Sequence, residues 1–407
     1  MAQTFHNDSI DGLLRDCLVL TYNAMNNGEE NHITNRKGMR MFYRSLKGVE
    51  LPSCYKLGVI TRACAVLKSR LKSMKRSVET GHPRQLRPMV CITSGFFVTM
   101  KGRLFIPLKR DRYVDVPLNA YVQDRLEGMK VRSLTITPDS LSFCISEEVE
   151  PMPVKTVYGV DRNEKNLTFG NADGVVQLDM SKAVRIRQTT REIVGSFKRN
   201  DVRVSKKIAS KYWKRANHRT DQMLHAATNF IVNAAAMNGA AIALEDLEGI
   251  RKMYQRGNKQ GPDYRFRLNS WPHWKAKRML EYKSGWNGVT EIHLTKSETR
   301  GSSSVHHACG EKLHSPERGD AVHRRMLWCQ ACKIWVDRDV NAAVVLSQRG
   351  LARFASSLPR LQSPSQRESF EVGEEGLAGE AMKGNGTTTS ILRVDASKLR
   401  TRRVTSS

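Results

Sequence analysis

The sequence lacks the features that would place it in a membrane or in a secretory pathway. No stretch approaches the roughly 20 apolar residues that a membrane-spanning helix requires. The first residues, MAQTFHNDSIDGLL, contain no basic segment followed by an apolar one, so we expect no signal peptide. There is also no internal repeat. We therefore expect a cytoplasmic protein without a membrane partner.

Acidic residues and paired cysteines are also scarce. The chain has 40 Asp and Glu against 67 Lys and Arg, a net charge of +27. This excess favours a polyanionic partner, because each phosphate neutralised releases counterions; the alternative is a solvated basic surface. Five of the eight cysteines are scattered among apolar neighbours at no disulfide-like spacing, which is typical of reduced core residues: Cys17, Cys54, Cys64, Cys91 and Cys144.

With 407 residues the chain is long enough for two or three domains. Residues 10–78 have helix-period apolar spacing, and one run, 55–76, carries a basic second face. Residues 88–153 contain short alternating segments separated by turn residues, which predicts a small β-barrel. Residues 353–407 are rich in Ser, Gly and Thr and poor in large apolar residues, so we expect a disordered tail.

The order of elements in residues 154–352 predicts an RNase H-like α/β domain. A strand ends at Asp161, a hairpin with an Asp173-Gly174 turn follows, and after a helical segment a second strand ends at Glu245. Asp339 stands at the start of an apolar helix. Strand ends converge in this fold, so Asp161, Glu245 and Asp339 can meet and hold a pair of Mg²⁺ ions, which prefer carboxylate oxygens.

Each acid also has a simpler explanation. An acid after a strand is commonly a turn former or a helix cap, and Asp339 could be the N-cap of the last helix. Asp246 and Asp337 compete with Glu245 and Asp339 for the two later positions.

Three cysteines and one histidine have the spacing of a zinc ribbon. His306 and Cys309 form one knuckle, and nineteen residues later Cys329 and Cys332 form another. A Cys₃His set is an acceptable structural zinc site, with a His where a Cys is usual. His307, His314 and His323 are competing ligands, and the alternative is a ribbon held only by packing of Trp328 and Trp335.

Residues 181–220 carry thirteen Lys and Arg against two acids. Tyr212 and Trp213 interleave with them and could stack on unpaired bases, although core packing explains at least one of the two. The candidate contacts to nucleic acid are Lys206, Lys207, Lys211, Lys214, Arg215 and Arg219.

Taken together, residues 154–350 resemble TnpB, the RNA-guided nuclease family of insertion-sequence transposons, and the related compact type V CRISPR effectors. Residues 159–163, 243–247 and 337–343 look like the three RuvC motifs, and 279–288 looks like the segment before the ribbon. In the family's third motif the catalytic acid stands two residues before the Asn, here Asn341, which selects Asp339 over Asp337.

The resemblance implies a multidomain α+β fold. Its parts would be a helical recognition region (1–87), a β-barrel wedge domain (88–153), a RuvC-like nuclease domain (154–300 and 337–352), an inserted zinc ribbon (301–336) and the tail (353–407). It implies an RNA-guided DNA endonuclease with guide RNA and target double-stranded DNA as partners, and with Mg²⁺ and Zn²⁺ as cofactors. It predicts no particular oligomeric state.

Four alternatives stay open at this point. The chain could be a compact type V CRISPR effector, or a nuclease-inactive RNA-guided repressor, although a repressor should have lost one of the three acids. A transposase without a guide would also use RNase H-like acids, but the ribbon between the second and third acids favours the guided nuclease. A generic RNA-binding protein would leave the three acids unexplained.

Overall fold

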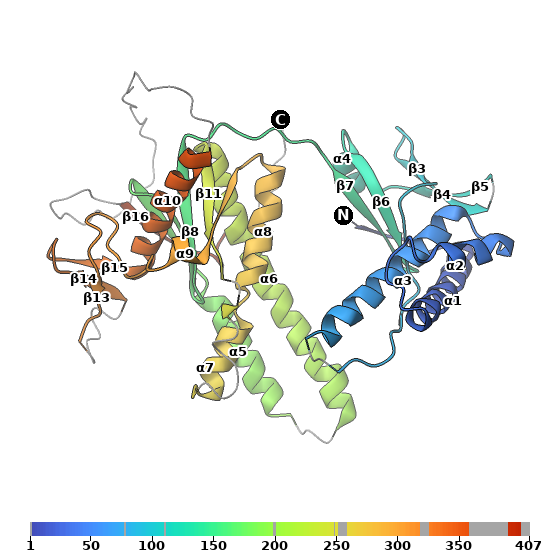
Figure 1. Cartoon of the computed structure of the whole chain (residues 1–407), viewed down its shortest axis with the longest axis horizontal. Coiled ribbons are helices and arrows are strands. Elements are labelled where there is room, and N and C mark those ends of the chain that lie inside the picture. Colours follow the sequence, from blue (N-terminus) through green and yellow to red (C-terminus); the bar gives the residue numbers. More distant parts are fainter. Residues whose placement is uncertain are drawn as a thin grey trace. The chain divides into compact units, whose positions relative to one another are not determined.

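The computed structural model describes residues 2–76, 79–109, 111–197, 201–247, 249–250, 259–317, 325–357 and 390–399. The chain divides into two compact units, Met1–Glu148 and Val149–Ser407 (Figure 1). Both units mix helices with β-sheets. In these ranges no helix has both the length and the apolar character needed to cross a membrane.

Helices α1 (Asp8–Glu30) and α3 (Ser53–Met74) are the long helices of the first unit, with the short helix α2 (Arg40–Ser45) between them. The side chain of Asn7 accepts a hydrogen bond from the Ile10 backbone N–H at 3.1 Å and so caps the start of α1. The buried Tyr55 hydroxyl of α3 donates to the Pro107 carbonyl at 2.9 Å, which fastens the helices to the neighbouring strands.

The strands of the first unit form two separately hydrogen-bonded sheets. One has the order β1-β7-β6-β2 and the other β3-β4-β5. The expected strands in residues 88–153 are therefore present, but their described hydrogen bonds form two sheets and do not close one barrel. The elements are β1 (Ala2–Thr4), β2 (Val90–Ile92), β3 (Phe97–Val98), β4 (Arg103–Lys109), β5 (Arg112–Pro117), α4 (Ala120–Leu126), β6 (Lys130–Ile136) and β7 (Ser140–Ser146).

Strand β1 is a departure from the expected helical region 1–87. It pairs antiparallel with β7, so the first residues belong to the sheet rather than to the helices. Three residues are too few to show a strand period, and this pairing could not be read from the sequence.

The second unit is built on a six-stranded sheet with the order β12-β11-β8-β9-β10-β16. β8, β9 and β10 are antiparallel neighbours, and β11 and β12 continue the sheet parallel to β8. This arrangement confirms the predicted strand, hairpin and later parallel strand. The bounds are β8 (Thr156–Arg162), β9 (Asn166–Gly170), β10 (Gly174–Asp179), β11 (Ala240–Glu245), β12 (Glu291–Leu294) and β16 (Ser390–Asp395).

Helices cover both faces of this sheet (Figure 1). α10 (Arg338–Ser357) packs on the face that carries Val157 and Ala243, whereas α6 (Ala209–Met237) and α8 (His273–Trp286) pack on the face that carries Val160 and Leu244. The two faces alternate along β8, so Asp161 shares the α10 face with Val157.

Glycine at position 159 allows α10 to approach β8 closely. A Cβ atom there would lie 2.1 Å from the Ala343 carbonyl oxygen and 2.4 Å from the Ser347 nitrogen, distances that no side chain tolerates. One turn further on, the buried Ser347 hydroxyl donates to the Val157 carbonyl at 2.6 Å. The start of α10 is therefore held against the strand that ends in Asp161.

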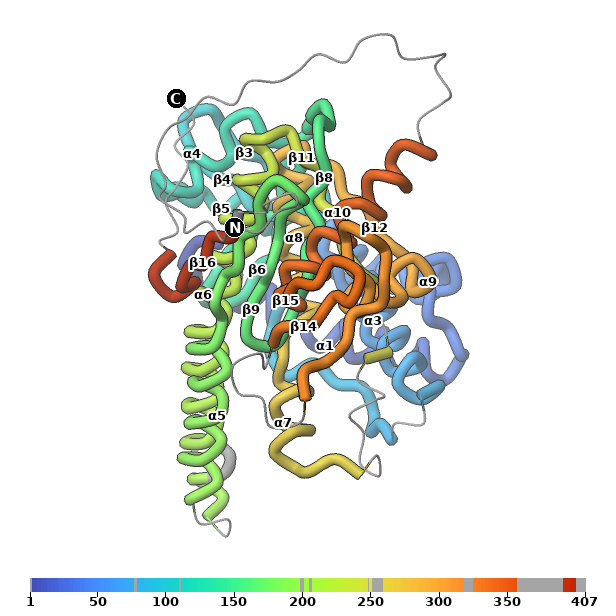
Figure 2. The backbone as a smooth tube through the Cα atoms, turned by 90° about the vertical axis from the view of Figure 1, so that its left-hand side faces the viewer, coloured from blue at the N-terminus to red at the C-terminus, as the bar shows by residue number. Residues whose placement is uncertain are grey.

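Helices α5 (Ser181–Gly195) and α6 run side by side as a long pair that projects from the sheet, as Figure 2 shows in green. A π-helical turn (Val204–Ile208) leads into α6 at the far end of the pair. The remaining elements are α7 (Pro262–Ser270), α9 (Lys296–Thr299) and the small sheet β13-β14-β15, formed by Leu313–His314, Met326–Cys329 and Ile334–Asp337.

The predicted disordered tail is wrong for two segments of residues 353–407. α10 continues to Ser357, and β16 joins the main sheet as a parallel neighbour of β10, with Ile391 opposite Val175 and Val394 opposite Leu178. Ala396 beyond the strand is buried. The composition of the tail did not predict this strand. A segment with only a few apolar residues can form a strand when the open edge of a sheet supplies its hydrogen-bonding partner. Residues 358–389 and 400–407 lie outside the described residues.

Candidate active site and metal centre

Asp161 lies near the end of β8, at the centre of the sheet. Its carboxylate is 9% exposed and accepts a hydrogen bond from the Asn163 side-chain amide at 2.6 Å. The next residue, Arg162, points to the other face, where its buried guanidinium donates to the backbone carbonyls of His273 and Glu245. The strand end is thus fixed from both faces, and the Asp161 side chain is left on the α10 side.

Glu245 is the last residue of β11, the parallel neighbour of β8. The hydrogen bond from Arg162 to its carbonyl oxygen, at 2.5 Å, ties the two strand ends together. Glu245 and Asp161 line one cleft of about 720 Å³, and Asp246 is not among the residues of that lining. The structure therefore places Glu245, rather than its competitor, beside Asp161.

Asp337 and Asp339 have different roles at the start of α10. Asp337 caps the helix: its Oδ1 atom accepts the backbone N–H of Asp339 at 2.9 Å and of Val340 at 3.3 Å. Asp339 stands in the first turn, is 2% exposed and lines the same cleft as Asp161. Because Asp337 serves as the cap, the Asp339 carboxylate is free to face the cleft, which supports the choice of Asp339.

Three carboxylates in one buried cleft repel one another. Burial raises the pKa of Asp161 well above its usual value, and the charges of Glu245 and Asp339 raise it further. Burial also raises the pKa of Glu245, against the opposing effect of the Arg162 charge. Such a desolvated cluster of oxygen donors suits hard divalent cations, which would relieve the repulsion.

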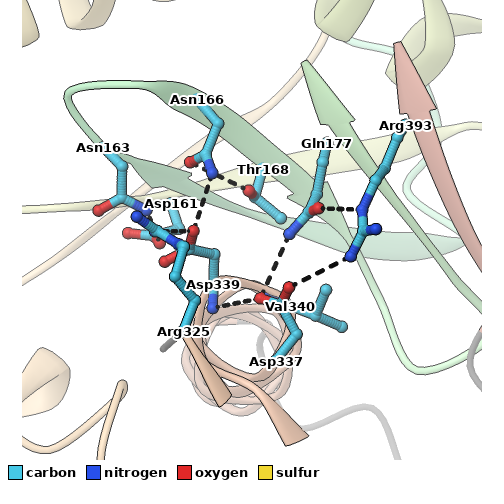
Figure 3. Close-up of polar contacts among 10 residues, drawn as sticks. All are labelled: Asp161, Asn163, Asn166, Thr168, Gln177, Arg325, Asp337, Asp339, Val340 and Arg393. Atoms are coloured by element: carbon cyan, nitrogen blue, oxygen red, sulfur yellow. Dashed lines mark hydrogen bonds and ion pairs between the residues drawn. The ribbon is translucent and has the colours of Figure 1, made fainter. Parts of the chain in front are cut away.

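Several polar residues that the sequence did not single out complete the cleft (Figure 3). The Asn166 side-chain amide donates to Oδ2 of Asp339 at 2.8 Å, as Asn163 does to Asp161. Arg325 forms an ion pair with the same Asp339 oxygen. The asparagines follow Asp161 in the chain, and their spacing from it is the only signal the sequence offered.

The predicted ribbon residues form one compact group. Nδ1 of His306 lies 3.2 Å from Sγ of Cys309 and 3.5 Å from Sγ of Cys332, and Sγ of Cys309 lies 3.5 Å from Sγ of Cys329. A tetrahedral zinc with ordinary bond lengths would space these atoms by about 3.5–3.8 Å. Burial lowers the pKa of His306 and so favours the neutral ring that can bind metal. The four residues therefore fit a structural zinc ion.

The histidine knuckle keeps the backbone geometry of the cysteine knuckle. The residue after the second ligand is left-handed in both, Gly310 with φ of +76° and Lys333 with φ of +56°. The Gly310 N–H donates to the His306 carbonyl and the Lys333 N–H to the Cys329 carbonyl, at 2.9 and 2.8 Å. Substituting His for Cys has thus changed the ligand atom and not the turn that presents it.

The competing histidines are placed elsewhere. The His307 backbone N–H donates to Oδ1 of Asn341 at 2.9 Å, and its ring Nδ1 lies 3.1 Å from the same oxygen. His314 lies in β13 outside the cluster, and His323 lies outside the described residues. Trp328 and Trp335 do pack together, with ring centroids 5.4 Å apart. The ribbon therefore contains both this aromatic contact and the group of four possible zinc ligands.

Asn341 joins the ribbon to α10. This fully buried side chain accepts from His307 and donates to the carbonyls of Ser302 and Val305, the latter at 2.7 Å. The first metal knuckle and the helix that carries Asp339 are therefore one connected structure.

The same region of the chain carries the match to a known family. Residues 273–346 match the family model described as "Cas12f1-like, TNB domain", a range that includes the zinc cluster and Asp339. The TnpB-like protein MJ0751 of Methanocaldococcus jannaschii is 29% identical over 231 residues, which cover 54% of this chain and 79% of that protein. Over this region the chain is similar to the TnpB/Cas12f-like family.

One solved structure aligns with more of the chain at lower similarity. The structure entitled "Cryo-EM structure of the Cas12f1-sgRNA-target DNA complex" aligns with 85% of this TnpB/Cas12f-like chain and 99% of its own, with a TM-score of 0.35 and 13% identity.

The predicted nucleic-acid contacts of this TnpB/Cas12f-like chain lie on the projecting α5–α6 pair. Lys207, Lys211 and Lys214 are exposed, and the side chain of Lys206 lies outside the described residues. Arg215 and Arg219 line a groove of about 700 Å³ together with Lys182 and Arg185 of α5. Tyr212 and Trp213 contact the rings of Phe197 and Phe266, so both are engaged within the protein.

Proposed function

We propose that this protein is an RNA-guided DNA endonuclease that hydrolyses phosphodiesters in the cleft lined by Asp161, Glu245 and Asp339. The observation that carries the proposal is the convergence of these three acids, which come from two strand ends and one helix start, in a single buried cleft. The similarity of the chain to the TnpB/Cas12f-like family and its net charge of +27 support guide RNA and target DNA as partners.

The three acids would hold the divalent metal, most simply as a pair of Mg²⁺ ions. When bound, such ions would help to activate the attacking water and to stabilise the leaving oxygen of a phosphodiester. Asn163 and Asn166 each donate to one oxygen of a carboxylate, Asp161 and Asp339 respectively, and would restrain these side chains for metal binding. Arg162 keeps the ends of β8 and β11 at a fixed separation.

Basic side chains at the cleft would bind the nucleic-acid backbone. Lys165, Arg325 and Arg338 line it together with the acids, so cations stand beside the carboxylates. A phosphate that enters between them would be held by charge from the protein. The grooved basic face of α5 and α6 would bind a further stretch of guide or target, and the ribbon would hold zinc as a structural element.

The test is cleavage by the purified ribonucleoprotein, with sequencing of the RNA that co-purifies. Asp161→Ala and Asp339→Ala should lower cleavage on the order of 10³-fold or more while guided DNA binding stays within about twofold. Asp124→Ala, an exposed acid of α4 in the other unit, is the matched control and should cleave normally.

RNA-free protein that cleaves DNA at the full rate would rule out guidance. Wild-type ribonucleoprotein that binds its target without cutting it would make the protein an RNA-guided repressor. The sequence of the co-purified RNA separates a transposon-associated protein from a CRISPR effector, because it identifies the locus from which the guide comes.

A further inference from the structure

The last strand of the main sheet contacts the cap of the helix that carries Asp339. Arg393 of β16 donates from Nε to Oε1 of Gln177 at 3.0 Å, and its guanidinium lies 3.6 Å from Oδ2 of Asp337 (Figure 3). The Gln177 side-chain amide donates in turn to Oδ1 of Asp337 at 3.3 Å. The three side chains form a closed ring.

The register of the sheet places Arg393 where this ring requires it. β16 runs parallel to β10, with Arg393 directly opposite Gln177. Ile391, two residues earlier, packs with Val340 and Val344 of α10, so it and Arg393 share the α10 face of the sheet. Val394 packs with the core on the other face. Apolar contacts on both faces therefore fix which way Arg393 points.

Asp337 needs such a partner. Its side chain is 11% exposed and lies two residues from Asp339, in the neighbourhood of the three cleft carboxylates. Oδ1 receives the N–H groups of Asp339 and Val340 and the amide of Gln177. Oδ2 has the charge of Arg393 as its described partner. Arg393 thus supplies the opposite charge that a largely buried carboxylate requires.

We propose that β16 is a positioning element of the candidate nuclease site, in which Arg393 holds the Asp337 cap and thereby sets the place of Asp339 at the cleft. The proposal rests on the proposed function for what Asp339 does, but its structural part is independent of it. Arg393 does not line the cleft and acts only through Asp337 and Gln177. The C-terminal segment Ser390–Asp395 would therefore contribute to the nuclease unit by positioning Asp339.

The structural part is tested by amide hydrogen exchange on the full chain. Arg393→Ala should speed exchange of the Asp339 and Val340 amides by about two- to fivefold, the range expected for losing an exposed ion pair and one hydrogen bond. Lys398→Ala removes the same charge from the same segment without a described contact to Asp337, and should leave those amides unchanged. Unchanged exchange in Arg393→Ala, or an equal change in Lys398→Ala, would overturn the proposal.

A conservative variant covers the case in which Arg393→Ala loosens the whole sheet. Arg393→Lys keeps a positive charge near Asp337 and should restore slow exchange at Asp339 and Val340. Fast exchange at those two amides in Arg393→Lys, with β10 and β16 still protected, would contradict a role that rests on the positive charge beside Asp337. Slow exchange at these amides in both variants would contradict the positioning role assigned to Arg393.

The functional part is read from the Mg²⁺ dependence of cleavage. Arg393→Ala should raise the half-activating Mg²⁺ concentration about two- to fivefold, with recovery of the rate at saturating Mg²⁺ and unchanged guided DNA binding. A merely structural loss would lower the rate at every Mg²⁺ concentration. If the wild type cleaves nothing, the proposed function fails and the exchange experiment still judges the inference. Normal cleavage with no shift in either readout would refute only the inference.

Discussion

Asp337 caps α10 and Asp339 faces the cleft, so substitutions of the two residues should have different effects. Asp337→Ala removes the acceptor of two backbone N–H groups at the start of α10 and of the Gln177 amide, which is 8% exposed. Loss of an N-cap costs about 1 kcal/mol, and a buried donor left without an acceptor costs about 1–3 kcal/mol. We therefore expect Asp337→Ala to lower the free energy of unfolding by roughly 2–4 kcal/mol.

Asp339→Asn should behave in the opposite way. It leaves the cap intact and removes one of three carboxylates that repel one another in the cleft. The free energy of unfolding should stay within about 0.5 kcal/mol of the wild-type value or rise, while cleavage is lost. Asp337→Asn is the matched control: asparagine caps a helix about as well as aspartate, so stability should change by less than about 1 kcal/mol.

The assay is urea unfolding of zinc-loaded protein without added Mg²⁺, followed by cleavage with the same preparations. The expected order of stability is Asp339→Asn, then Asp337→Asn, then Asp337→Ala, and the expected order of cleavage places Asp339→Asn last. If Asp339→Asn were the least stable variant and still cut DNA, Asp339 would be a structural residue and the assignment of the two acids would be reversed.

Two further predictions concern the ribbon and a buried acid. Metal analysis should find about one zinc ion per chain. His306→Cys should retain this zinc content, and His306→Ala should lower it. An equal zinc content in His306→Ala would show that the histidine is not a ligand. Burial raises the pKa of Glu291 to about 7 from 4.5, so the folded state keeps a proton that the unfolded state releases, and stability should fall as pH rises from about 4.5 to 7. Urea unfolding should therefore show Glu291→Gln to be more stable than wild type by up to roughly 3 kcal/mol at pH 8 and nearly equal to it at pH 4.5. The same pH dependence in both proteins would show that Glu291 does not cause the loss of stability.

The elements that the sequence predicted are those with a strong local signal. β8 and β11 are apolar runs that end at an acid, and the Asp173-Gly174 turn marks the hairpin between β9 and β10. The ribbon has a fixed ligand spacing, and its four residues do come together. Each of these patterns lies in one short segment or, in the ribbon, in two short knuckles at a characteristic spacing, so the sequence was sufficient to predict these elements.

The elements that were missed depend on partners far along the chain. β1 and β16 are short strands that pair with the open edges of β7 and β10. A local sequence pattern does not show which strand will lie at the edge of a sheet. The same holds for Arg325, which meets Asp339 only because the ribbon folds back on α10. Residue chemistry alone could not separate Asp337 from Asp339, since either acid is suited to cap a helix; only the resemblance to the family's third motif selected Asp339.

The sheet order also has a consequence for biosynthesis. β10 ends at Asp179 and its partner β16 begins at Ser390, so more than two hundred residues are translated between the two. At about 5–20 residues per second, this interval lasts roughly 10–40 s. During that time the nascent chain presents the unpaired edge of β10, and an unpaired edge is a template for pairing with another chain. Slowed elongation after Asp179 should therefore increase aggregation of newly made protein, and a chaperone that binds extended edges should decrease it.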